Sequence, residues 1–199
     1  MRILYFDLET RVGPLTLSPK NEQLGWELLR AGKGGISSLA IYDTQDRWLH
    51  FYDDHTIGQA ARHLESADAL IGYSSVGFDV PVVEGILGRK LALRHHFDIY
   101  AGIALAGAHR GLVGTKGDCT LDTVARRNIG QGKIEHGSHA EDLAKAGHWG
   151  KLFNYCADDV RLTRELFHYI CEHDGVHVMS TYITLDIPAW LRKAGLEKL

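Results

Sequence analysis

Four acidic residues, spread over three segments of the 199-residue chain, have the types and spacing that metal-dependent chemistry requires. They are Asp7 and Glu9 in FDLET, Asp79 in GFDVP and Asp159 in YCADD. Carboxylate oxygens suit the hard cations Mg²⁺ and Mn²⁺. Two such ions about 4 Å apart can generate a nucleophile and stabilise a leaving oxygen. Whether the carboxylates can meet depends on the elements that carry them.

Asp7 and Glu9 directly follow Ile3–Phe6, a short apolar run that predicts a buried strand. Residues two apart on a strand point to the same face, so the two carboxylates would lie side by side. A polar strand end that reaches solvent is the commoner explanation of an isolated pair of this kind. After a buried strand, however, unpaired carboxylates are costly, and a bound cation would remove that cost.

Asp79 has an ordinary structural explanation as well. It stands two residues before Pro81, at the start of a helix that we expect over Val80–Leu87. An aspartate in this place commonly accepts hydrogen bonds from the first backbone amides of the helix. Capping would explain Asp79 on its own, but a capping carboxylate can also be a metal ligand.

Asp159 falls in a long helix that we expect over Lys151–His173. At about 100° per residue, Asp159 lies at the edge of the apolar stripe of this helix, and Tyr155 lies one turn earlier on the same edge. Asp158 points away, so the helix is expected to aim Asp159 into the fold. A Tyr and an Asp at this spacing usually form a hydrogen bond on a helix face.

The rest of the pattern predicts a mixed sheet with helices packed on it. Further strands are expected at Ile36–Tyr42, Arg47–Tyr52 and Ala69–Tyr73, at the start of His96–Ala106, and within residues 176–188. Further helices are expected at Ile57–Glu65, Thr120–Asn128, Ala140–Ala146 and the later part of His96–Ala106. Long loops are expected at residues 11–35, with a helical turn over Gln23–Leu29, and at Gly107–Gly117.

Composition limits the possible classes of protein. With 45% hydrophobic residues and no internal repeat, residues 1–199 are expected to form one domain. A net charge of −3 does not indicate a strongly basic coat protein, so any binding of nucleic acid must depend on a local part of the surface. Three widely spaced cysteines favour a reducing, cytoplasmic environment, and no apolar stretch reaches the length of a membrane span.

The three acidic segments are more specific together than apart. In this order and spacing the chain resembles the DEDD superfamily of 3′-to-5′ exonucleases in its tyrosine-bearing (DEDDy) branch, particularly predicted exonucleases related to the proofreading domain of B-family DNA polymerases. The resemblance rests on FDLET, GYSSVGFDVP and the YxxxD of Tyr155–Asp159, and covers most of the chain. It implies an RNase H-like α/β fold of three layers, with a mixed central sheet flanked by helices. It also implies metal-dependent release of nucleoside monophosphates from single-stranded 3′ ends, with DNA favoured over RNA.

The resemblance assigns roles to five residues. Asp7 would bridge two Mg²⁺ or Mn²⁺ ions, Glu9 and Asp159 would hold the ion that carries the attacking water, and Asp79 would hold the other. Tyr155 would orient the water. It would not deprotonate the water, because an ordinary phenol has a pKa of about 10.

Substrate contacts are expected from Thr10, through main-chain amides near it, and from Ser74 and Phe78. The second motif of the family often has an asparagine a few residues before its Phe-Asp pair, whereas this chain has Ser74 and Ser75. Because serine is shorter, this departure puts the placement of the substrate in question. Asp98 in HFDIY is expected to cap a helix, with a position near the metal site as the alternative.

Two basic clusters could bind a phosphate backbone, but we favour solvated helix faces for both. They are Arg89, Lys90, Arg94, His95 and His96, and Arg126, Arg127 and Lys133. A structure-selective endonuclease and an inert nucleic-acid-binding module on the same fold remain alternatives. Tyr155 argues against the branch with histidine in its place. The sequence does not decide between DNA and RNA, because the metal chemistry acts on the phosphate.

Overall fold

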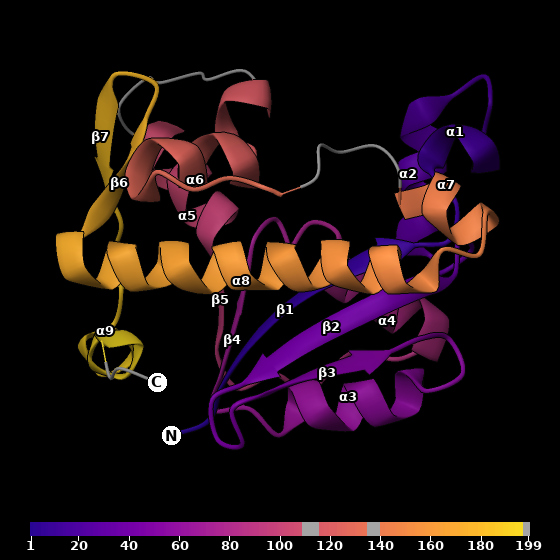
Figure 1. Ribbon diagram of the computed structural model, residues 1–199, viewed down its shortest axis with the longest axis horizontal. Helices are drawn as coiled ribbons and strands as arrows, with labels where there is room; N and C mark the ends of the chain where they lie inside the picture. Colours follow the sequence, from indigo (N-terminus) through magenta and orange to yellow (C-terminus); the bar gives the residue numbers. More distant parts are fainter. Residues whose placement is uncertain (109–115, 135–139, 197–199) are drawn as a thin grey trace.

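The computed structural model describes residues 1–108, 116–134 and 140–196, and its centre is a five-stranded sheet (Figure 1). The strands are β1 (Ile3–Thr10), β2 (Ile36–Asp43), β3 (Trp48–Tyr52), β4 (Ala69–Gly72) and β5 (His96–Asp98). Their order across the sheet is β3-β2-β1-β4-β5. Strand β2 is antiparallel to β1 and β3, whereas β4 is parallel to β1 and β5. The sheet is therefore mixed, as the sequence predicted.

Helices cover both faces of this sheet, which gives the predicted three layers. The face under α8 (Trp149–His173) also carries α5 (Ile99–Ala108), α6 (Leu121–Ile129) and α9 (Ala189–Leu196). The opposite face carries α3 (Ile57–Glu65) and α4 (Asp79–Leu87). Near the C-terminal end of β1 lie α1 (Pro14–Leu17), α2 (Glu22–Arg30) and α7 (Ala140–Lys145) (Figure 1). A short 3₁₀ helix, Lys116–Cys119, precedes α6.

The central strand β1 divides its side chains between the two layers. Tyr5 packs edge-on against Phe167 of α8, with ring centroids 6.0 Å apart. Phe6 lies in the core on the other face, with α3 and α4. Because side chains alternate along a strand, Asp7 and Glu9 follow Tyr5 onto the face that α8 covers.

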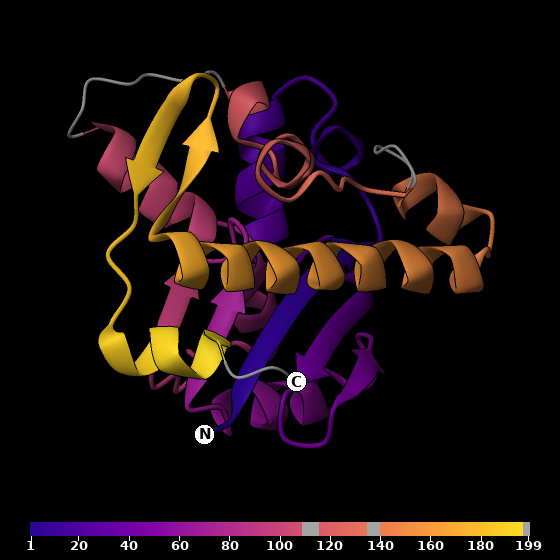
Figure 2. The same ribbon diagram turned by 60° about the vertical axis from the view of Figure 1, so that its left-hand side comes forward.

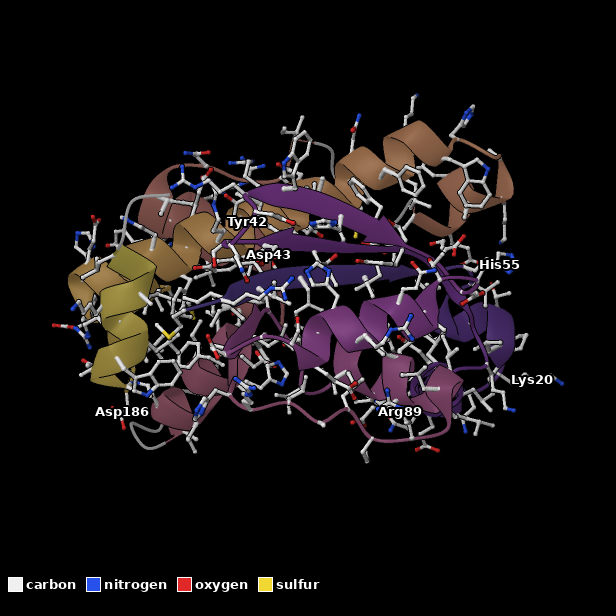
Figure 3. All side chains as sticks on the ribbon, turned by 90° about the horizontal axis from the view of Figure 1, so that it is seen from below. Lys20, Tyr42, Asp43, His55, Arg89 and Asp186 are labelled. Carbon is white, nitrogen blue, oxygen red and sulfur yellow. The ribbon has the colours of Figure 1, made fainter. Side chains whose placement is uncertain are left out.

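Strand β2 is tied to both helix layers beside the start of β1. Tyr42 and Asp43 are its neighbouring residues labelled in Figure 3. The guanidinium of Arg164 on α8 lies 4.5 Å from the centre of the Tyr42 ring. On the other face, the fully buried Asp43 carboxylate accepts hydrogen bonds from Arg2 (2.6 Å) and, at 3.1 Å, from the His63 imidazole of α3. These contacts hold the sheet and its helices together at the end of β1 remote from Asp7 and Glu9.

Most predicted elements are confirmed, but residues 11–35 differ from the prediction. They form two helices, α1 and α2, rather than a loop with one helical turn. Asn21 caps α2 by accepting a hydrogen bond from the Leu24 amide (3.1 Å). The glycines in this segment hid the helix from the sequence pattern, although Gly25 is needed: a Cβ there would overlap the carbonyl of Pro14.

The C-terminal prediction is also wrong in part. A hairpin of β6 (Gly175–Val178) and β7 (Thr181–Thr184) takes the place of the single strand predicted within residues 176–188, and α9 follows it unpredicted. The turn gives no sequence signal, because Met179 takes a left-handed conformation (φ 52°) that glycine or asparagine usually supplies. Figure 2 shows this hairpin beyond α8, beside α5 and α6. Much of the predicted loop Gly107–Gly117 lies outside the described residues.

No helix in the described parts of the chain is both long enough and apolar enough to cross a membrane. The longest of them, α8, has 25 residues and carries charged side chains throughout. Its apolar stripe packs on the sheet, as the predicted amphipathic pattern requires.

Helices α2 and α4 meet through backbone rather than side chains. A Cβ placed on Gly85 of α4 would overlap the Arg30 carbonyl and would lie 2.6 Å from the nitrogen of Gly32. Gly32 itself has φ 75°, a conformation that side chains rarely adopt. The two glycines therefore let the C-terminal end of α2 lie directly against α4.

We expect Gly85→Ala to destabilise the protein by about 1–3 kcal/mol, because the methyl group would meet fixed backbone. Gly58→Ala in α3 is the matched control, since a Cβ there meets nothing within 4 Å. That substitution should be neutral or stabilising by up to about 1 kcal/mol. Urea unfolding of both variants measures the difference, and equal stabilities would contradict the close α2–α4 contact.

Candidate metal centre

Three of the four acidic residues come together where α8 crosses the C-terminal half of β1. Asp7, Glu9 and Asp159 each offer a carboxylate oxygen, and these atoms lie within 4.8 Å of one another. Asp7 and Glu9 retain some access to solvent, whereas Asp159 is only 4% exposed. Their spacing on the strand and the direction of Asp159 on the helix together produce this cluster.

Asp79 reaches the same part of β1 from the other side. Its Oδ1 accepts a hydrogen bond from the amide of Leu8, the residue between Asp7 and Glu9, at 3.0 Å. Phe78 occupies the cap position of α4, so helix capping does not by itself explain Asp79. The carboxylate is buried, 3% exposed, and its negative charge contributes to the raised pKa of Asp7.

Burial and mutual repulsion make this cluster hold protons strongly. Burial, followed by the charges of Asp159, Asp79 and Glu9, raises the pKa of Asp7 well above its ordinary range. Burial is also the largest cause for the other three carboxyl groups. Their pKa values rise to about 8 for Glu9, about 7 for Asp79 and about 6 for Asp159. A divalent cation would favour the charged forms and relieve the repulsion.

The donor set fits a hard divalent cation. Every candidate ligand atom is a carboxylate oxygen, which suits Mg²⁺ or Mn²⁺ better than softer metals. Asp159 also has a buried oxygen, Oδ1, that accepts no hydrogen bond from the described residues. A buried acceptor without a partner is costly, and a cation held between Asp7, Glu9 and Asp159 would satisfy it.

Lys133 supplies a positive charge to this acidic group. Its ammonium donates hydrogen bonds to Asp159 Oδ2 (2.6 Å) and to the Tyr155 hydroxyl (2.9 Å). Burial works against this charge, but Asp159 and Tyr155 hold the pKa of Lys133 above its ordinary value. The prediction that Lys133 belongs to a solvated helix face is therefore wrong. It follows α6 in a non-helical segment, which is why a helix pattern could not place it.

Tyr155 stays a neutral phenol in this setting. Burial, then the charges of Asp159 and Glu9, raises its pKa to about 12. The helix spacing predicted a Tyr155–Asp159 pair, but the direct link between them is the Lys133 ammonium, which lies 4.7 Å from the centre of the Tyr155 ring. The hydroxyl can therefore position a neighbouring oxygen without acting as a base.

Two carboxylates fix the backbone that carries Lys133. Its amide donates to Asp122 (2.7 Å), and the amide of Ile134 donates to Asp158 (2.8 Å). Asp158 also pairs with Arg161 at 2.8 Å and is only 9% exposed. Asp158 was expected to point away from the fold, but it is buried, and the described residues that lead to Ile134 cover it. A helical wheel could not show that cover.

The loop before Asp79 is held by Asp98. Its carboxylate accepts hydrogen bonds from the amides of Ser74 (2.9 Å) and Val76 (2.8 Å), and from Ala101 in the first turn of α5 (3.1 Å). Asp98 thus makes the helix-terminal contact that the sequence favoured. Ser74 takes a left-handed conformation, with φ 64°. Asp98 and Ser74 therefore shape the loop, and neither belongs to the cluster of Asp7, Glu9 and Asp159.

The other predicted substrate contacts border the acidic group along the chain. Thr10 follows an irregularity in the pairing of β1 with β2, and its hydroxyl donates to the carbonyl of Val12 at 3.0 Å. Phe78 is half-buried and directly precedes Asp79. Ser75 is fully buried and forms a hydrogen bond with His96 (2.8 Å).

The predicted basic cluster around Arg89 lies on the surface, paired with acidic side chains. Arg89, Lys90 and Arg94 form salt bridges with Glu65, Glu84 and Asp68 respectively. Arg89 is labelled in Figure 3. These three side chains are solvated, but they lie in the segment between α4 and β5 rather than on a helix face, and His96 of the same cluster belongs to β5 and bonds to Ser75.

The raised pKa values predict how stability depends on pH. The pKa of Glu9 is about 8 in the folded protein and 4.5 ordinarily, so in this range the folded state binds a proton that the unfolded chain has released. Without metal, stability should fall as pH rises through this window. Melting curves in EDTA at about pH 6 and about pH 9 should show the fall, and Mg²⁺ should raise the melting temperature more at the higher pH.

Asp7→Asn should reduce both the fall in melting temperature between about pH 6 and about pH 9 and the rise in melting temperature on adding Mg²⁺. The substitution removes one repelling charge and one ligand. Asp186→Asn, at an exposed position labelled in Figure 3, is the control and should behave as the parent protein. An apo protein whose melting temperature rises over the same pH range would contradict the raised carboxyl pKa values.

The chain matches no protein-family model and no curated protein. Among solved structures it is similar to the family B DNA polymerase from the hyperthermophilic archaeon Pyrobaculum calidifontis, with a TM-score of 0.58 and 18% sequence identity. The similarity covers 90% of this chain and 26% of the polymerase chain, so the chain corresponds to only part of that protein's length. This likeness shows the fold, which is RNase H-like as the sequence implied.

Proposed function

We propose that this protein is a metal-dependent 3′-to-5′ exonuclease that releases nucleoside monophosphates from single-stranded nucleic acid. The observation that carries the proposal is the meeting of Asp7, Glu9 and Asp159, with Asp79 bonded to the same strand and Tyr155 linked through Lys133. The motif resemblance and the fold shared with a B-family DNA polymerase support the same activity.

The carboxylates of Asp7, Glu9, Asp79 and Asp159 would hold two Mg²⁺ or Mn²⁺ ions. When bound, such ions activate water at neutral pH and stabilise charge on the leaving 3′ oxygen. The charges of Asp159, Asp79 and Glu9 all act on Asp7, so Asp7 would be a ligand common to both ions. The raised pKa values mean that the carboxyl groups release protons as the ions bind.

Tyr155 and Lys133 would orient the attacking water. The Tyr155 hydroxyl is neutral at physiological pH because its pKa is about 12, so it can donate one hydrogen bond and accept another. Lys133 already donates to this hydroxyl, which leaves the hydroxyl proton available for the water oxygen. Orientation of this kind places the oxygen in line with the phosphorus.

The acidic group has one side on β1 and α8, with Asp7, Glu9 and Asp159, and another on α4, with Asp79. The 3′-terminal nucleotide of the substrate would lie between these two sides. Main-chain amides near Thr10, together with Ser74 and Phe78, would contact it. We expect single-stranded DNA to be favoured over RNA, in a cytoplasmic repair or proofreading role. An inert binding module is less well supported, because an inert module has no need of buried like-charged carboxylates, which cost stability.

Asp7→Asn and Asp159→Asn should each abolish Mg²⁺-dependent release of mononucleotides, because each removes a ligand charge. Digestion of 5′-labelled single strands of DNA and RNA, with Mg²⁺, Mn²⁺ or EDTA, measures this and shows the polymer preference. A circular single strand should resist, since an exonuclease needs an end. Cleavage of the circle would favour a structure-selective endonuclease, and full activity in either variant would refute the site assignment.

Tyr155→Phe should lower kcat about 10- to 100-fold, because the water loses its orienting hydroxyl while the carboxylate ligands stay in place. Tyr169→Phe, on the same helix, is the matched control and should retain the parent rate. Single-turnover kinetics at saturating Mg²⁺ separate the chemical step from substrate binding. A Tyr155→Phe enzyme with unchanged kcat would remove Tyr155 from the mechanism.

A further inference from the structure

An aromatic pair borders the acidic group on the α4 side. Trp26 of α2 contacts Phe78 edge to face, with ring centroids 5.5 Å apart and an interplanar angle of 82°. Both side chains are half-buried, so each retains some exposure to solvent. Because Phe78 directly precedes Asp79, the pair lies immediately beside the candidate metal ligands.

The position of Trp26 is fixed by the contacts of α2 rather than by the aromatic pair itself. Gly25, its neighbour, lies against the backbone of Pro14, and Gly85 of α4 lies against the backbone at the C-terminal end of α2. These contacts leave no room for α2 to shift towards α4. The indole N–H of Trp26 also donates to Glu22, one turn earlier, at 3.2 Å.

Arg30 adds a positive charge to the same surface. It stands one helical turn after Trp26, and its Nε donates to the carbonyl of Gly77, next to Phe78, at 2.8 Å. It forms no ion pair with the residues that the structure describes, in contrast to the paired Arg89. On the adjoining loop, Val76 is 52% exposed. Aromatic rings, an exposed apolar side chain and a guanidinium that has no carboxylate partner among the described residues thus form one surface.

We propose that Trp26, Phe78 and Arg30 form a binding surface for the single-stranded segment that leads to the 3′ end. Trp26 and Phe78 would contact the faces of unpaired bases, and Arg30 would contact a backbone phosphate. Such a combination is sequence-tolerant and suits single strands, whose bases are unstacked and free to pack on aromatic rings. The surface deepens the proposed function, since it names Trp26 and Arg30 as substrate-binding residues outside the acidic group.

Binding can be measured separately from hydrolysis. The affinity of a 5′-fluorescein oligothymidylate is measured by anisotropy in EDTA, where the strand stays intact. Trp26→Ala should weaken binding about tenfold or more, and Trp26→Phe should keep much of the affinity. Trp48→Ala is the matched control, because Trp48 lies on β3 and is already 70% exposed. Arg30→Gln should lower the salt dependence of the affinity, because about one counterion fewer is released on binding.

A second substrate isolates the acidic group. The p-nitrophenyl ester of thymidine 5′-monophosphate has no upstream bases, so Trp26→Ala should raise KM for the oligonucleotide far more than KM for this ester. The proposed binding surface would be refuted if Trp26→Ala and Trp26→Phe bound the oligonucleotide as tightly as Trp48→Ala does. A dimer of the parent protein that Trp26→Ala dissolves in sedimentation would also refute it, because Trp26 would then contact a second copy.

The two proposals can fail independently. If the parent protein binds the strand through Trp26 but hydrolyses neither the strand nor the ester with Mg²⁺ or Mn²⁺, the exonuclease assignment fails and the binding surface stands. If hydrolysis proceeds and depends on Asp7, but the Trp26 variants bind strands normally, the binding surface fails and the exonuclease assignment stands.

Discussion

The repulsion among the closely grouped carboxylates at the crossing of β1 and α8 is the constraint on which the rest of the structure depends. Burial raises the pKa values of Asp7, Glu9, Asp79 and Asp159, so each charge placed there opposes folding. The carboxylates of Asp7 and Glu9 cannot turn away, because β1 is the middle strand and its two faces are covered by helices. The fold therefore needs positive charge at this point, either from Lys133 or from bound cations.

Lys133 can meet only part of that need, and its own placement depends on further charges. Its single ammonium bonds to Asp159 and acts on Asp7 and Glu9 by its charge alone, so protonation or metal must supply the remainder. Its backbone is held by Asp122, and the adjoining amide by Asp158. Because these hydrogen bonds reach Lys133 through the main chain, they fix where its ammonium can lie without competing for it. The acidic group and the segment that carries the Lys133 ammonium are thus held in place by different contacts.

The sequence predicted the parts of this arrangement that follow from local periodicity. Alternation on β1 gave the shared face of Asp7 and Glu9, and the wheel of α8 gave the inward direction of Asp159. Lys133 was misplaced because it lies in an irregular segment, where position depends on contacts with distant Asp122 and Asp158. Helix α2 was predicted only as a single turn for a related reason: Gly25 weakens a helix pattern locally but is required by the tertiary contact with Pro14. A residue such as Gly25, which a close backbone contact requires, lowers the local helix propensity and so hides the helix that contains it.

The two sides of the acidic group differ in how they are built, and this difference separates the residues proposed for chemistry from those proposed for binding. Asp7, Glu9 and Asp159 belong to β1 and α8, whose apolar residues form one continuous core, so their mutual distances are set by dense packing. Trp26 and Arg30 belong to α2, which meets α4 through glycine and main chain, with partly exposed side chains towards solvent. Side chains on α2 can therefore vary without moving the carboxylates. If the protein is the exonuclease proposed above, substitutions on α2 would change the nucleic acid that it binds while the spacing of its carboxylates stays the same.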